Sequence, residues 1–117
     1  MAEQSETTQK AVKRLDRIMR AARTGIDPVV PIQIVQTFLA VAANEGKSTS
    51  EIAEIVGANV STASRHLLDL GDRDRNKNPG YGLIERRVDP MELRRNNYFL
   101  TTKGKLVLDQ LINALGG

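Results

Sequence analysis

The segment 48–70, STSEIAEIVGANVSTASRHLLDL, constrains the fold of this chain more than any other. Two short runs of apolar residues at helical spacing are separated by a single glycine, Gly57. The hydroxyl residues at positions 48–50 can cap the first helix, and Gly57 can end it by allowing a sharp turn. A second helix is expected from about Asn59 to about Leu70.

The apolar residues of this segment also fit two helices that cross closely. Ala53 is small enough to let the helices approach, and four further residues can fix their angle. These four are Val56, Ala58, Ala63 and Leu67. The segment therefore predicts a helix-turn-helix.

The outward face of the second helix is rich in hydrogen-bonding groups, namely those of Ser61, Thr62, Ser64, Arg65 and His66. Such side chains can donate to base edges and phosphates and fit within a major groove. Any helical hairpin has polar outer residues, however, and serines near a helix start are ordinary caps. The single histidine has no second metal-binding partner and is either a DNA contact or a surface residue.

Residues 82–100 predict a β-hairpin, with strands at 82–88 and 97–100 and a tip at 89–96. Arg94 and Arg95 fall near the apex, where they could lie along phosphates or enter a minor groove. Alternatively Asp89 or Glu92 pairs with these arginines and orders the hairpin. Both roles can hold together.

Helices are expected on either side of this central region. Residues 7–23 form an amphipathic helix with a basic back, which ends at Thr24-Gly25, and residues 32–44 form the core helix after a proline-rich linker. Thr102 is expected to cap a last helix at 103–115, whose surface is more apolar than one small domain needs. The terminal helices are therefore predicted to meet a partner subunit.

Composition narrows the class of protein. With 117 residues, 40% of them apolar, no cysteine and no long apolar run, the chain is expected to be one soluble, cytoplasmic domain without disulfides. The net charge is only +3, but residues 71–105 contain nine basic and five acidic residues. Proteins that bind single-stranded nucleic acids commonly stack the bases on aromatic side chains. Because aromatic residues are only 3% of the chain, double-stranded DNA is the better-matched ligand.

Catalytic signatures are missing from the sequence. It has no serine–histidine–carboxylate motif, no glycine-rich phosphate loop and no carboxylates at metal-binding spacing. We therefore expect neither an enzyme, a cofactor nor a metal site, and no residue cluster identifies a small-molecule effector.

Three strings in this order, EIAEIVGANVSTASRHLLDL, YGLIERRVDP and RRNNYFLTTKGKLVLDQL, resemble the winged-helix regulators of the MarR type. The likeness covers about residues 31–115. It implies a homodimer with two recognition helices in successive major grooves and two wings in flanking minor grooves. The sequence departs from the family in a longer loop at 71–80 and in ending directly after the last helix.

The sequence thus predicts a mainly α chain with a small β-hairpin, a winged helix-turn-helix flanked by terminal helices that serve dimerisation. Residues 1–26 form the N-terminal helix and 27–117 the DNA-binding domain. The predicted function is sequence-specific binding of double-stranded DNA in transcriptional regulation, most simply repression. A protein-interaction module on the same scaffold and a DNA-binding protein of plasmid or phage replication are the alternatives. The predicted DNA-binding residues are Ser50, Asn59, Ser61, Thr62, Ser64, Arg65, His66, Arg86, Arg87, Arg94, Arg95, Asn96 and Asn97.

Overall fold

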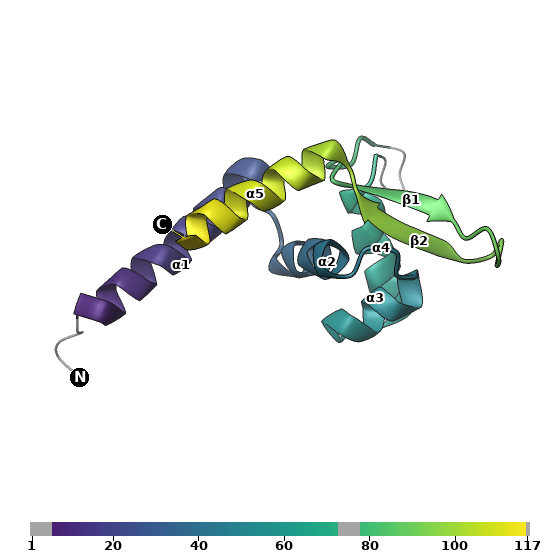
Figure 1. Ribbon diagram of the computed structural model, residues 1–117, viewed down its shortest axis with the longest axis horizontal. Helices are drawn as coiled ribbons and strands as arrows, with labels where there is room; N and C mark the ends of the chain where they lie inside the picture. Colours follow the sequence, from purple (N-terminus) through teal and green to yellow (C-terminus); the bar gives the residue numbers. More distant parts are fainter. Residues whose placement is uncertain (1–5, 73–77, 117) are drawn as a thin grey trace. The chain divides into compact units, whose positions relative to one another are not determined.

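The computed structural model describes residues 6–72 and 78–116. In this part of the chain, five helices accompany one two-stranded antiparallel sheet, as predicted (Figure 1). In chain order the elements are α1 (Glu6–Gly25), α2 (Ile32–Ala43), α3 (Thr49–Val56), α4 (Val60–Leu70), β1 (Ile84–Val88), β2 (Asn96–Leu100) and α5 (Thr102–Gly116).

The chain divides into two compact units. One contains α1 and the part of α5 from Val107 onward, and the other spans Pro31–Leu106. The second unit holds α2, α3, α4 and the hairpin, so it contains all of the predicted DNA-binding residues. The domain boundaries 1–26 and 27–117 stay a prediction.

Helix α2 is the core of the second unit. It packs against α3, α4 and β2, and it buries Ile34, Phe38 and Val41. The one polar side chain buried here, that of Thr37, donates its hydroxyl to the carbonyl of Gln33 at 2.8 Å and so costs little. This confirms the predicted central helix, with Asn44 as its C-cap.

The helix-turn-helix is confirmed at α3 and α4. Ser48 caps α3 and forms a capping box with Glu51, while Gly57 ends the helix in the left-handed conformation at φ 74°. Asn59 then caps α4, because its side-chain oxygen accepts from the backbone N–H of Thr62 at 2.8 Å. Ser50 is not a cap and lies exposed within α3.

The β-hairpin is shorter at its start than predicted. The strand expected from Gly82 begins at Ile84, since the backbone of Leu83 is used elsewhere: its N–H donates to Leu70 and its carbonyl accepts from Thr101. At the far end Asn96, predicted in the tip, pairs with Val88 as the first residue of β2.

The start of α5 corrects one further prediction. The hydroxyl of Thr101, not of Thr102, accepts from the N–H of Gly104 at 3.0 Å and donates to the carbonyl of Gly82 at 2.7 Å. Thr102 is instead the first, exposed residue of the helix. The cap therefore also holds α5 to the segment that precedes β1.

In the first unit, α1 confirms the amphipathic helix, yet its apolar side is largely uncovered. Val12, Leu15 and Met19 are each at least half exposed, and only Ala22 is buried. Ile112 and Leu115 of α5 are also about half exposed. Among the described residues, no helix has the length and hydrophobicity that crossing a membrane requires.

Candidate nucleic-acid interface

The outward face of α4 is not packed into the core of the protein. Ala63, Leu67 and Leu70 are buried on the inner side of the helix. On the other side Ser61 and Arg65 are exposed, and the remaining predicted residues Thr62, Ser64 and His66 are half-buried. Within residues 6–72 and 78–116, none of these five side chains forms a hydrogen bond or ion pair of its own. Their donors and acceptors are therefore available to a ligand.

The N-terminal end of α4 adds a positive electrostatic contribution to this face. The first-turn N–H groups of a helix carry partial positive charge and favour anions. Asn59 uses its side-chain oxygen for the cap, which leaves its amide nitrogen as the group that can donate outward. His66 lines a polar hollow of about 290 Å³ with Gln33, Gln36 and Thr37 of α2.

The hairpin, or wing, is fixed to the helix-turn-helix along β2. The N–H of Gly46 donates to the carbonyl of Tyr98 at 2.8 Å, and the N–H of Tyr98 donates to the carbonyl of Lys47 at 3.1 Å. The hydroxyls of Tyr98 and Thr49 are 2.9 Å apart. These bonds hold the base of the wing against the start of α3.

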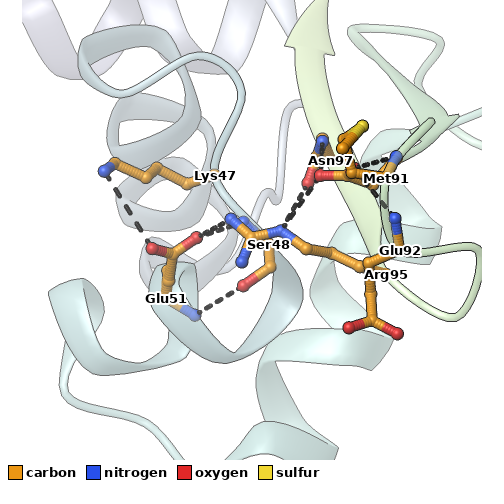
Figure 2. A network of polar contacts seen from close by, with 8 residues as sticks. Lys47, Ser48, Glu51, Met91, Glu92, Arg95 and Asn97 are labelled. Atoms are coloured by element: carbon orange, nitrogen blue, oxygen red, sulfur yellow. Dashed lines mark hydrogen bonds and ion pairs between the residues drawn. The ribbon is translucent and has the colours of Figure 1, made fainter.

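A polar network then ties the tip of the wing to α3 (Figure 2). The guanidinium of Arg95 donates to Glu51 through Nη2 and to Asn97 through Nε, the latter at 3.0 Å. The same Nε lies 3.6 Å from a carboxylate oxygen of Asp89, which also accepts from the amide of Asn97 at 3.0 Å. Glu51 therefore accepts from the wing while it completes the capping box with Ser48.

The carboxylates of this network are stabilised in the ionised form. The backbone N–H of Ser48 lowers the pKa of Glu51, partly opposed by burial and helped by the Ser48 hydroxyl bond, Arg95 and Lys47. The amide of Asn97 and the N–H of Met91 lower the pKa of Asp89, again with a contribution from Arg95. At neutral pH both carboxylates are therefore charged and able to hold the wing.

The network settles part of the role predicted for the tip. Asp89 does pair with Arg95, as the sequence analysis allowed, and its other oxygen accepts from the N–H groups of Met91 and Glu92. Glu92 pairs with no arginine among the described residues. Arg95 and Asn97 thus order the hairpin, and their polar groups are largely committed to it.

The other predicted wing residues are differently placed. Arg87 stacks over the ring of Phe99, 4.0 Å from its centroid, and pairs with Glu85 at 2.9 Å. Arg86 and Arg94 are exposed and form no hydrogen bond or ion pair with any described residue. Asn96 is half-buried, and its side chain has no bonded partner in the described ranges. Arg73, Arg75 and Lys77, which contributed to the basic charge of the sequence, lie outside the described residues.

Sequence reasoning missed the second role of Glu51. The spacing Ser48-x-x-Glu51 is a capping-box signature, so the first role could have been found. Its pairing with Arg95 joins residues 44 positions apart and leaves no local signal. The exposure of Met91 and Leu93 at the tip of the wing was likewise not anticipated. In the described part of the chain, no group of three histidines or acidic residues is placed to hold a metal ion.

Comparison with known proteins gives the fold a family likeness. No protein-family model and no curated protein sequence matches the chain. Among solved structures, the transcriptional repressor CouR bound to a 23-mer DNA duplex matches with a TM-score of 0.65 and 21% identity, over 94% of this chain and 70% of that one. A mutant of MepR from S. aureus, bound to an oligodeoxyribonucleotide, matches with a TM-score of 0.70 and 20% identity, over 97% and 78%.

A third structure, the MarR family transcription regulator SP03579, has a TM-score of 0.65 and 17% identity. Here the match covers 93% of this chain but only 64% of that one, so the chain spans less than two thirds of its length. The chain therefore has the winged-helix fold of the MarR-family regulators, as the sequence strings suggested.

Proposed function

We propose that this protein is a sequence-specific double-stranded DNA-binding regulator of transcription, acting as a homodimeric repressor in the cytoplasm rather than as an enzyme. The observation that carries the proposal is the free, hydroxyl-rich face of α4 with the exposed guanidinium of Arg65. A winged helix-turn-helix presents this helix to a major groove. The fold shared with DNA-bound repressors supports the same assignment.

The proposed contacts divide between two grooves. Ser61, Thr62, Ser64, Arg65 and His66 face the major groove, where arginine reads guanine through two hydrogen bonds. Arg86 and Arg94 supply the cations of the wing, because Arg95 and Arg87 already have partners within the hairpin. We retain Ser50, Asn59 and Asn96 as candidates for phosphate contacts. Asn97 is assigned to the wing itself, because its side chain bonds to Arg95 and Asp89.

The uncovered apolar side chains of α1 and α5 support a homodimer. Val12, Leu15 and Met19 on α1, and Ile112 and Leu115 on α5, would each be buried by a second copy. Two copies would recognise a two-fold symmetric site with half-sites about 34–36 Å apart. Sedimentation that shows a monomer at micromolar concentration would contradict this arrangement.

The decisive experiment is selection of bound duplexes from a random pool, followed by affinity measurement at several salt concentrations. We expect a two-fold symmetric site and a loss of affinity of roughly a thousandfold between 50 and 200 mM salt. Arg65→Ala should abolish selective binding, whereas Arg65→Lys keeps the charge and should lose mainly base discrimination. Binding insensitive to salt, or unaffected by Arg65→Ala in folded protein, would refute the proposal.

The same exposed apolar side chains of α1 favour a second candidate, a protein-interaction module on this scaffold. The two functions respond differently to Arg65→Ala and Arg94→Ala, because only DNA binding needs these cations. A protein that acts in plasmid or phage replication would bind DNA equally well. The genomic position of the selected site would distinguish that role from transcriptional control.

A further inference from the structure

The tip of the wing carries apolar side chains that the protein leaves uncovered. Met91 is 93% exposed, Leu93 is 78% exposed, and Val88 at the end of β1 is 57% exposed. Single exposed apolar residues need no explanation, but here three lie within six positions at one apex. Hairpin tips usually carry polar and turn-forming residues instead.

This apex is an ordered turn. Asp89 accepts from the N–H groups of Met91 and Glu92, at 2.8 and 3.2 Å. The carbonyl of Arg95 accepts from the N–H of Asp89 at 2.8 Å, and the N–H of Arg95 donates to the carbonyl of Glu92 at 2.9 Å. Arg95 in turn bonds to Glu51 of α3 (Figure 2). The apolar side chains are thus presented in a fixed position on the same unit as α4.

The charges around the apex select the kind of partner. Arg94, the neighbour of Leu93, is exposed and unpaired within the described residues, and it can reach a phosphate. The apex belongs to a two-stranded hairpin that projects beyond α3 (Figure 1), a slender shape for a minor groove about 6 Å wide. Leucine and methionine are among the residues that proteins insert between base steps from this groove.

We propose that Met91 and Leu93 form an apolar wing tip that enters the DNA minor groove, packing on deoxyribose edges and flexible base steps, while Arg94 binds the adjacent phosphate. This inference rests on the proposed function and adds to it a hydrophobic component of DNA recognition. Glu92 is the one exposed acid among the described tip residues, and its charge opposes close approach to phosphates. The apolar tip would therefore respond to groove shape, while Arg94 supplies the charge that meets the phosphate.

The test compares Met91→Ser/Leu93→Ser with Arg94→Ala on the selected duplex, by affinity at several salt concentrations and by hydroxyl-radical footprinting. The apolar double variant should lose about tenfold in affinity with an unchanged slope of log K against log salt, since it removes no cation. Arg94→Ala should instead reduce the magnitude of that slope by about 2, because each copy in the dimer loses one phosphate contact worth about 0.9. Val29→Ser, which removes an 84% exposed apolar side chain outside the wing, serves as the matched control and should change neither.

The footprint separates failure of this inference from failure of the proposed function. The double variant should lose protection in the flanking minor grooves and keep it at the α4 site. Unchanged affinity and flanking protection, with Arg65→Ala still abolishing binding, would overturn the apolar tip alone. A change in oligomeric state without any change in footprint would identify the tip as a protein contact and also overturn it. Absence of any specific duplex for the unmodified protein would overturn both.

Discussion

Substitution of Gly104 by alanine sets two effects against each other at the junction of the wing and α5. Gly104 is the third residue of α5 and is buried. Helix propensity alone favours alanine over glycine by up to about 1 kcal/mol. A Cβ at this position, however, would lie 2.0 Å from the carbonyl oxygen of Leu83 and 3.0 Å from its carbonyl carbon.

The contact decides the sign of the change. A close carbon–oxygen contact measures roughly 3.3 Å, so helix and strand entry must separate by about 1 Å. Overpacking of this kind costs about 1 to 3 kcal/mol. The same carbonyl accepts from the N–H of Thr101 at 3.0 Å, and weakening that bond adds about 1 kcal/mol. The expected net loss is therefore about 2 kcal/mol in the free energy of unfolding.

Urea unfolding followed by circular dichroism measures this loss directly. Gly104→Ala should lower the midpoint with an unchanged m-value, because the native contact and not the unfolded chain is altered. Gly116→Ala is the matched control: it also lies in α5, and its added Cβ meets nothing within 4 Å. That variant should stay within about 0.5 kcal/mol of the original protein. A Gly104→Ala protein as stable as this control would refute the close approach of α5 to Leu83.

Two further predictions concern the network around Glu51. Glu51→Gln can keep the capping box but loses the ion pair with Arg95, so overall stability should change little. The N–H groups of Met91 and Glu92 should nevertheless exchange faster with solvent at fixed pH, and slowed or unchanged exchange would contradict the network. Acid should have a similar effect: folding lowers the pKa values of Glu51 and Asp89, so their stabilisation is complete above the unfolded values near 4 and is lost as pH falls through the lower folded values. The protection factors of the same two N–H groups, which are the intrinsic exchange rates at each pH divided by the rates measured by NMR between about pH 6 and 2, should therefore fall on acidification. Protection factors that rise would show the sign to be wrong.

The sequence predicted most of the fold because its signals are local. Gly57, with helical apolar spacing on both sides, was enough to identify the helix-turn-helix, and α3 and α4 confirm it. The errors occurred where distant groups compete for the same backbone. The start of β1 was predicted two residues too early, at Gly82 rather than Ile84, because the N–H of Leu83 is taken by Leu70 and its carbonyl by Thr101.

The candidate site was predictable only in part, for the same reason. The free face of α4 follows from helical periodicity, since burying Ala63 and Leu67 turns Arg65 outward. The wing arginines are alike in sequence, and Arg94 and Arg95 are adjacent. Only the tertiary contact with Glu51 distinguishes Arg95, which holds the hairpin, from Arg94, which remains available.

The number of arginines without a partner determines the electrostatic contribution expected for the proposed DNA affinity. In the described part of the second unit, the exposed and unpaired arginines are Arg65, Arg86 and Arg94. A dimer would then bring six of them to DNA, and at about 0.9 per phosphate the salt slope is close to −5. That value accounts for the roughly thousandfold loss expected over a fourfold rise in salt. A measured slope much steeper than this would mean that residues beyond these three, such as the lysine and arginine residues of the segment 71–80, also contact phosphates. A shallower slope with unchanged affinity would instead shift weight to uncharged contacts such as the hydroxyls of α4 and the apolar wing tip.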